Sequence, residues 1–209
     1  AGPAMLIIDE NVGQAITLNH PATLWYTLSL SAIPTTLLVG HLQKARYYLS
    51  LLQDSMAGSD LHIWHQFTLC FENIVLIRQG SPEESVPRLG EALLQLHAQG
   101  DSPLYSLFRS EYAQGLALLG LEQLALEVIS ETLHIAQARG ERWFVPELLR
   151  IKAQLLLKQD KPSLLPLVKA TLREAMSEAR NQGADFWTAR IAADQARLQP
   201  VELACSGGN

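Results

Sequence analysis

The sequence predicts an all-α solenoid of consecutive antiparallel helical hairpins, with about ten helices in all. Glycines recur at Gly40, Gly80 and Gly120, 40 residues apart, and a small residue follows each of them five positions later. Glycine suits a reversal between two helices because it enters the left-handed region at little steric cost. The small residue fits where the second helix of the hairpin crosses close to the first.

A second set of glycines interleaves with the first. Gly58, Gly100, Gly140 and Gly183 are spaced 42, 40 and 43 residues apart. Two helix-ending turns in each unit of roughly forty residues predict a repeated helical hairpin, which is typical of a solenoid. No sustained period-2 pattern indicates a strand.

The turns divide the chain into its expected helices, which are residues 4–18, 21–39, 41–57, 60–79, 82–99, 102–119, 121–139, 141–158, 162–182 and 184–198. Pro34 lies inside the second and is expected to kink or locally break it. The last hairpin has Asp160 where the 40-residue spacing would place a glycine, so a longer turn is expected there.

Helix starts are marked by acidic or hydroxyl residues that can cap exposed amide groups. Asp60, Asp101 or Ser102, Glu141 and Asp185 each follow one of the interleaved glycines. An aromatic residue lies early in the helix after each of these turns, and early in the first hairpin; these residues are Trp25, Trp64, Tyr105, Trp143 and Trp187. We expect them to fill the gaps between neighbouring hairpins, since buried aromatic residues usually pack in a core rather than stack on a ligand.

At 209 residues the chain can form one continuous domain, expected over residues 1–200 with a disordered tail at 201–209. A net charge of −5 and the lack of a Lys/Arg cluster argue against direct contact with nucleic acid. Cys70 and Cys205 are interpreted as free thiols in a reducing, cytoplasmic compartment. The segment from Asn11 to Gln43 has no charged residue, but polar residues and proline interrupt it, which disfavours a membrane helix. We interpret it as a buried helix, or as one whose outer face packs against an upstream repeat.

Catalytic and cofactor signatures are missing from the sequence: it has no phosphate loop, no GxGxxG and no GxSxG. His62 and His65 are three residues apart, but a zinc site needs three or four ligands and no third is near. Carboxylates fall mostly on the polar faces of second helices, where a solvated charge is the default. The sequence therefore predicts a protein that is not an enzyme, with no cofactor and no metal.

In a stack of hairpins the first helix of each pair is expected to line an inner groove, so its polar residues are the binding candidates. The candidates are His65, Asn73, Arg109, Ser110, Gln114, Glu147, Arg150 and Gln154, and further polar residues of first helices are Glu72, Arg190 and Asp194. Arg150 can hold a carboxylate or a phosphate in a bidentate manner. The alternative is a pair within its helix, with Glu147 at i, i+3 or with Gln154 at i, i+4.

The turn glycines and the small residues that follow them resemble tetratricopeptide (TPR) repeats. Ala113 and Ala153 match the small residue of the TPR first helix, whereas Asn73 and Ile33 depart from it. The period of about 40 residues exceeds the usual 34 of this family. The resemblance implies a right-handed superhelix with longer helices than the standard repeat.

A more specific resemblance lies in GERWFVPELLRIKAQLLL (Gly140–Leu157), with support from His20–Gly40 and Trp64–Gly80. These segments are similar to the long TPR-like C-terminal region of bacterial multidomain regulators. Such proteins place a winged-helix or cyclase domain and a P-loop ATPase module before that region. The resemblance implies a non-catalytic sensor segment that binds a protein segment, a small effector or other domains of its parent. The alternative is a structural scaffold or a homo-oligomerisation module that uses the uncharged stretch as an apolar contact.

Overall fold

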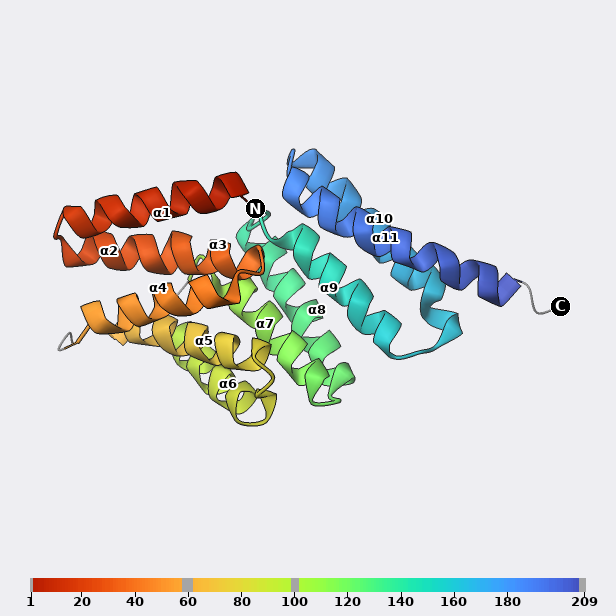
Figure 1. Cartoon of the computed structure of the whole chain (residues 1–209). Coiled ribbons are helices and arrows are strands. Elements are labelled where there is room, and N and C mark those ends of the chain that lie inside the picture. Colours follow the sequence, from red (N-terminus) through yellow and green to blue (C-terminus); the bar gives the residue numbers. More distant parts are fainter. Residues whose placement is uncertain (1, 58–61, 99–101, 207–209) are drawn as a thin grey trace. The chain divides into compact units, whose positions relative to one another are not determined.

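The computed structural model of the chain describes residues 2–57, 62–98 and 102–206, without the side chains of His62 and of residues 199–206. Within these ranges the regular secondary structure is helical and no strand is present (Figure 1). The predicted all-α fold class is confirmed. The chain divides into two compact units, Ala1–Phe108 and Arg109–Asn209.

The described part of the first unit begins with five helical rods in sequence. Its elements are α1 (Gly2–Thr17), α2 (Pro21–Thr27), a π-helical segment (Leu28–Ala32), α3 (Ile33–Leu38), α4 (Leu42–Ser55), α5 (His62–Arg78) and α6 (Pro82–Ala98). Neighbours in sequence pack against each other: α1 on α2, α3 on α4, α4 on α5 and α5 on α6. The glycine-delimited helices of the prediction are thus present, with ends that differ by a few residues.

Pro34 has the local effect expected from the sequence. A π-helical segment, Leu28–Ala32, joins α2 to α3, so Pro21–Leu38 is one continuous rod with a widened turn. Proline has no N–H to donate to the carbonyl four residues earlier, and a π turn accommodates that missing bond. The Thr36 hydroxyl donates to the carbonyls of Ala32 and Ile33, both at 2.8 Å. With this rod counted once, the described residues contain ten α-helical rods, as expected.

Aromatic rings fill the core of the first unit. The centroids of Trp25 and Trp64 are 6.5 Å apart, and Trp64 lies 5.8 Å from Phe67. Phe108, at the end of the unit, meets Phe67 at 5.6 Å and Phe71 at 5.0 Å in edge-on contacts. Such tilted and edge-on pairs contribute beyond the area they bury. Core packing of Trp25 and Trp64 is confirmed.

The second unit contains most of α7 (Tyr105–Leu118) and all later helices. These are α8 (Glu122–Arg139), α9 (Val145–Lys158), a 3₁₀ turn (Pro162–Leu164), α10 (Leu165–Asn181) and α11 (Asp185–Ser206). Helix α9 packs against α8, α10 and α11. It is therefore the central element of this unit.

The turn glycines adopt the left-handed conformation that their spacing predicts. Gly40, Gly80, Gly120, Gly140 and Gly183 all have positive φ, between 62° and 94°. At each, the residue after the glycine donates its amide to the carbonyl five positions earlier, as in Ser81 to Leu76 at 3.1 Å. This bond is the closing bond of the Schellman motif and satisfies a carbonyl at the helix end. Asp160 takes the same conformation with φ of 49°, although it has a side chain to accommodate.

Several expected details need correction. Helix α9 begins at Val145, so Glu141 lies in the preceding turn rather than in the first helical turn. Trp143 is 38% exposed, and the adjacent Phe144 occupies the core instead. Helix α11 continues to Ser206, well past the expected end near residue 198 and into the predicted tail.

Other expectations concern residues outside the described ranges. Gly58, Asp60, Gly100 and Asp101 lie outside them, and so does the side chain of Cys205. Ser102 does cap its turn, since its hydroxyl accepts the amide of Leu104 at 3.3 Å. The single domain over residues 1–200 stays a prediction.

Candidate functional site

Helix α9 carries a buried ionic cluster that joins it to α11 in the second unit. The Arg150 guanidinium donates from Nε and Nη2 to the two oxygens of Glu147, both at 2.7 Å. Its Nη1 donates to Oδ2 of Asp194 at 2.7 Å. All three residues are buried. A fork-to-fork pair of this kind is stronger and more directional than a single ion pair.

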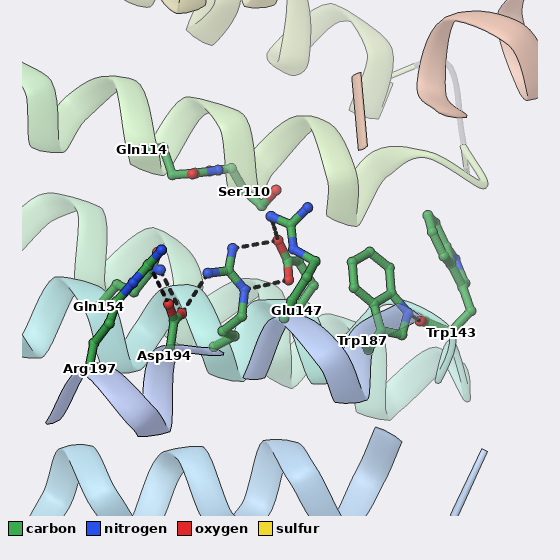
Figure 2. A network of polar contacts seen from close by, with 10 residues as sticks. Ser110, Gln114, Trp143, Glu147, Gln154, Trp187, Asp194 and Arg197 are labelled. Atoms are coloured by element: carbon green, nitrogen blue, oxygen red, sulfur yellow. Dashed lines mark hydrogen bonds and ion pairs between the residues drawn. The ribbon is translucent and has the colours of Figure 1, made fainter. Parts of the chain in front are cut away.

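Polar groups at the edge of this cluster complete the hydrogen bonding of its two carboxylates. Figure 2 shows Gln154 and Arg197 converging on Asp194, at 2.7 Å to Oδ2 and 3.1 Å to Oδ1. Arg190 donates to Oε1 of Glu147 at 2.9 Å. The cluster therefore contains three arginines and two carboxylates, all hydrogen-bonded.

The surroundings of Arg150 fix its charge. Burial alone would lower the pKa of Arg150, but hydrogen bonds and charge from Glu147, and then from Asp194, outweigh it and raise that pKa above its usual value. The pair between Glu147 and Arg150, the alternative drawn from the i, i+3 spacing, is thus present. Arg150 and Gln154 do not pair as the i, i+4 spacing suggested but share the acceptor Oδ2 of Asp194. Ligand binding by these residues stays a prediction, with the donors of Arg150 already directed at protein carboxylates.

The remaining candidates of the second unit lie on α7. Arg109 donates from Nε to the Thr132 hydroxyl at 2.8 Å and forms an ion pair with Glu131, so its head group faces α8. Ser110 is fully buried, and Gln114 donates to the Ser110 carbonyl at 3.2 Å. Ligand binding by these three side chains stays a prediction.

The first unit, by contrast, has an open groove along the exposed face of α5. One hollow of about 420 Å³ lies between α5 and α6. Its lining residues are Gln66, Leu69, Glu72, Asn73, Leu76, Arg88, Glu91, Ala92 and Gln95. A second hollow of about 370 Å³ lies between α4 and α5. His65 lines it, together with Leu69 and Glu72 from the first hollow. Leu69 and Glu72 line both hollows, so the two adjoin along α5, and we call them together the α5 groove.

The α5 groove contains polar atoms that the protein leaves without a partner. Asn73 is 4% exposed; its Nδ2 donates to the Leu69 carbonyl at 2.8 Å, while its Oδ1 has no hydrogen-bond partner. The buried Oε1 of Gln66 is also without a partner. An unsatisfied buried acceptor costs about 1–3 kcal/mol, so such groups in a folded protein need an explanation.

The free-energy cost of the unsatisfied acceptor in Asn73 is more informative because of where this residue lies in the repeat. Ala113 and Ala153 stand 40 and 80 residues later, and both are fully buried in their own helices. The repeat therefore tolerates a small apolar residue there, and packing does not require the carboxamide. The sequence identified Asn73 as a departure from the repeat, and the structure shows what that departure introduces.

The sequence indicated three members of this groove, His65, Glu72 and Asn73, but not the others. Gln66, Leu69 and Leu76 share the face of α5 with them at the i, i+3, i+4 spacing of a helix. That spacing was visible in the sequence. The contribution of α6 through Gln95 was not, because it depends on how the two helices cross.

Metal and membrane chemistry have no structural support within the described ranges. No group of three or more His, Cys, Asp or Glu side chains there is placed to hold a metal ion. Among the described helices none is both long and apolar enough to cross a membrane. Cys70 is a free, buried cysteine as expected, and burial raises the pKa of its thiol to about 12.

Comparison with known proteins gives a structural match without a sequence match. No protein-family model matches the chain, and no curated protein matches its sequence. The structure is similar to the crystal structure of Bacillus thuringiensis PlcR in complex with the peptide PapR7 and DNA, with a TM-score of 0.69. That match covers 90% of this chain and 69% of the PlcR chain at 12% sequence identity. The fold is TPR-like. At this identity the similarity establishes the fold alone.

Proposed function

We propose that this chain is a non-catalytic, TPR-like binding segment of a bacterial transcriptional regulator, and that it recognises an extended protein segment in the α5 groove. The observation that carries the proposal is Asn73, a buried carboxamide with an unpartnered Oδ1 at a position where the two following repeats have alanine. Proteins retain such locally unfavourable groups mainly at functional sites. The parent would be cytoplasmic, and its other domains are further candidate partners.

The composition of the α5 groove suits a peptide better than a compact metabolite. Carboxamides can donate to and accept from a peptide backbone, while Leu69 and Leu76 offer apolar contact between them. The two hollows adjoin at Leu69 and Glu72, so a ligand that occupies both would have to be extended rather than compact. The fold match to PlcR, which was crystallised with a peptide, supports this choice of partner.

The charge of the groove indicates which segments would bind. Glu72 and Glu91 line the first hollow, and Arg88 is the one cation among its lining residues. Arg88 already lies 3.5 Å from Glu84 in a pair along α6. A segment with a basic side chain or a free amino terminus is therefore expected to bind more tightly than an acidic one. In the parent, such binding would act as a switch only if one arrangement of its domains binds the segment better than the other.

A selection from a random heptapeptide library displayed on phage tests this proposal directly. Enriched peptides would be synthesised and titrated into the whole chain by calorimetry. Leu69 is 42% exposed, so Leu69→Asp alters the groove without opening the core. It should weaken binding at least tenfold, whereas Leu94→Asp, at an exposed leucine of α6 that does not line the groove, should not.

Two results would contradict the proposal. One is a library that yields no peptide above background after repeated rounds. The other is a set of enriched peptides whose affinity is the same for Leu69→Asp, Leu94→Asp and the unaltered chain. Circular dichroism of each variant would show whether its helices are intact.

The alternative role in oligomerisation is favoured by one specific observation. Helix α1 exposes large apolar side chains, among them Leu6 at 72% and Ile7 at 58%. Exposed patches of this type often mark protein–protein contacts. Sedimentation over a range of concentrations tests this candidate: self-association that Leu6→Glu abolishes would favour it, and a monomer at all concentrations would exclude it for this chain.

A further inference from the structure

A separate hollow lies in the second unit, among α9, α10 and α11. It has a volume of about 470 Å³. Leu157, Val168, Leu172 and Leu198 line it from the three helices, so most of its wall is aliphatic. Pockets of this volume, with apolar walls and a few polar groups, are typical of small-molecule sites.

The polar part of the wall is positively charged. Lys158 and Arg197 line the hollow, together with Asp194 and Gln154 from the edge of the ionic cluster. Lys158 has no ion-pair partner among the described residues, and the Arg197 side chain is 78% exposed despite its bond to Asp194.

The neighbouring ionic cluster does not neutralise the positive charge on the wall of the hollow. Its three arginines, Arg150, Arg190 and Arg197, outnumber its two carboxylates by one. Asp194 already accepts from Arg150, Gln154 and Arg197, so it has little capacity left for a cationic ligand. Figure 2 shows Gln154 and Arg197 gathered around Asp194. Two cations beside an aliphatic wall are complementary to a ligand with an apolar body and one anionic end.

We infer that this hollow binds a medium-chain aliphatic carboxylate, with the hydrocarbon against Leu157, Val168 and Leu172 and the carboxylate at Lys158 and Arg197. The guanidinium of Arg197 has N–H donors beyond the one that Asp194 accepts, and a carboxylate matches their planar geometry. A neutral alkyl ligand would lack the charge interaction with Lys158 and Arg197, and a short carboxylic acid would lack the apolar contact with the aliphatic wall. The inference concerns the second unit and does not depend on peptide binding in the α5 groove.

Calorimetric titration of the whole chain with sodium decanoate, below its micelle concentration, tests the inference. Decanoate is expected to bind with one-to-one stoichiometry. 1-Decanol, sodium acetate and decyltrimethylammonium bromide should each bind at least tenfold more weakly, since each lacks either the long chain or the negative charge.

Matched variants locate the site. Lys158→Glu and Leu157→Asp change exposed residues of the hollow, and each should weaken decanoate binding at least tenfold. Lys161→Glu, a charge reversal at an exposed residue that does not line the hollow, should leave the affinity unchanged. The inference is overturned if decanoate does not bind, if the cationic amphiphile binds as well as decanoate, or if all three variants bind it like the unaltered chain.

Discussion

The two units of this protein treat polar residues on their first helices in opposite ways. In the second unit, Arg150 on α9 donates three hydrogen bonds to Glu147 and Asp194. In the first unit, Asn73 on α5 leaves its carbonyl oxygen without a partner beside an open hollow. Both residues are buried and polar, and sequence alone nominated both for binding. The difference shows that the fate of the hydrogen-bonding atoms separates a structural polar residue from a candidate binding residue.

The largest expected effect comes from breaking the ionic cluster. Arg150→Met should lower the free energy of unfolding by about 3 kcal/mol, because Glu147 and Asp194 would remain buried without their central cation. Urea denaturation followed by circular dichroism measures this change. A matched variant that also carries Glu147→Leu and Asp194→Leu should recover most of the loss, since no buried charge would then be unpaired. A loss below about 0.5 kcal/mol for Arg150→Met would show that the cluster is not structural.

Introducing an asparagine into the second unit, at the position equivalent to Asn73, tests the same difference between the two units. Ala153→Asn should cost about 1–3 kcal/mol, because it adds volume and an unsatisfied carboxamide at a fully buried position. Ala192 on α11 is exposed, so Ala192→Asn controls for helix propensity and should cost about 0.7 kcal/mol or less. Equal costs at the two sites, again from urea denaturation, would contradict the burial argument.

Substitutions at the helix-ending turns are expected to change the stability by an intermediate amount. Gly120 has φ of 75° and open space where a Cβ would lie, so Gly120→Ala should cost about 1–2 kcal/mol from backbone conformation alone. Asp160 holds the same conformation with a side chain, and Asp160→Gly should stabilise by up to about 1 kcal/mol. Gly13, in the middle of α1 and without a positive φ, is the control. Gly13→Ala should stabilise by about 0.5–1 kcal/mol, and thermal unfolding would reveal the opposite signs.

The smallest expected effect is a pH dependence in the first unit. A hydrogen bond from Lys44, at 2.8 Å, and a second from Tyr48 lower the pKa of Asp9. A lowered pKa in the folded state gives stability that is present above the unfolded value of about 3.9 and is lost as the pH falls through the folded value. Asp9 is about half exposed, so Asp9→Asn should cost less than about 1 kcal/mol at neutral pH. The difference between the two proteins should vanish in acid; a difference that persists at low pH would contradict this origin.

The fold could be predicted largely because the turns that end its helices depend on the local sequence. A glycine that ends a helix needs only its own left-handed backbone and the carbonyls of the preceding turn, and all five described turn glycines behave in this way. Helix starts were less predictable. Glu141 follows a turn glycine as a helix-opening residue would, yet α9 begins at Val145, and Phe144 rather than Trp143 enters the core.

The candidate site was less predictable because its partners are distant in sequence. Asp194 meets Arg150 across 44 residues, and the spacing of the repeat brings the two helices together without saying which side chains meet. Arg109 was predicted to face a groove, yet Thr132 and Glu131 on α8 bind it. The asparagine at position 73 was visible as a break in a pattern. Its unpartnered oxygen was not, since that depends on every neighbour.

The most direct test of the account is Asn73→Ala, measured for stability and for binding in the same preparation. The free energy of unfolding of this variant should stay the same or rise by up to about 1 kcal/mol, because an unsatisfied buried acceptor is removed. Its affinity for a peptide selected on the α5 groove should fall at least tenfold. A variant that loses more than about 1 kcal/mol of stability yet binds that peptide unchanged would contradict the proposal, since Asn73 would then serve the fold rather than recognition.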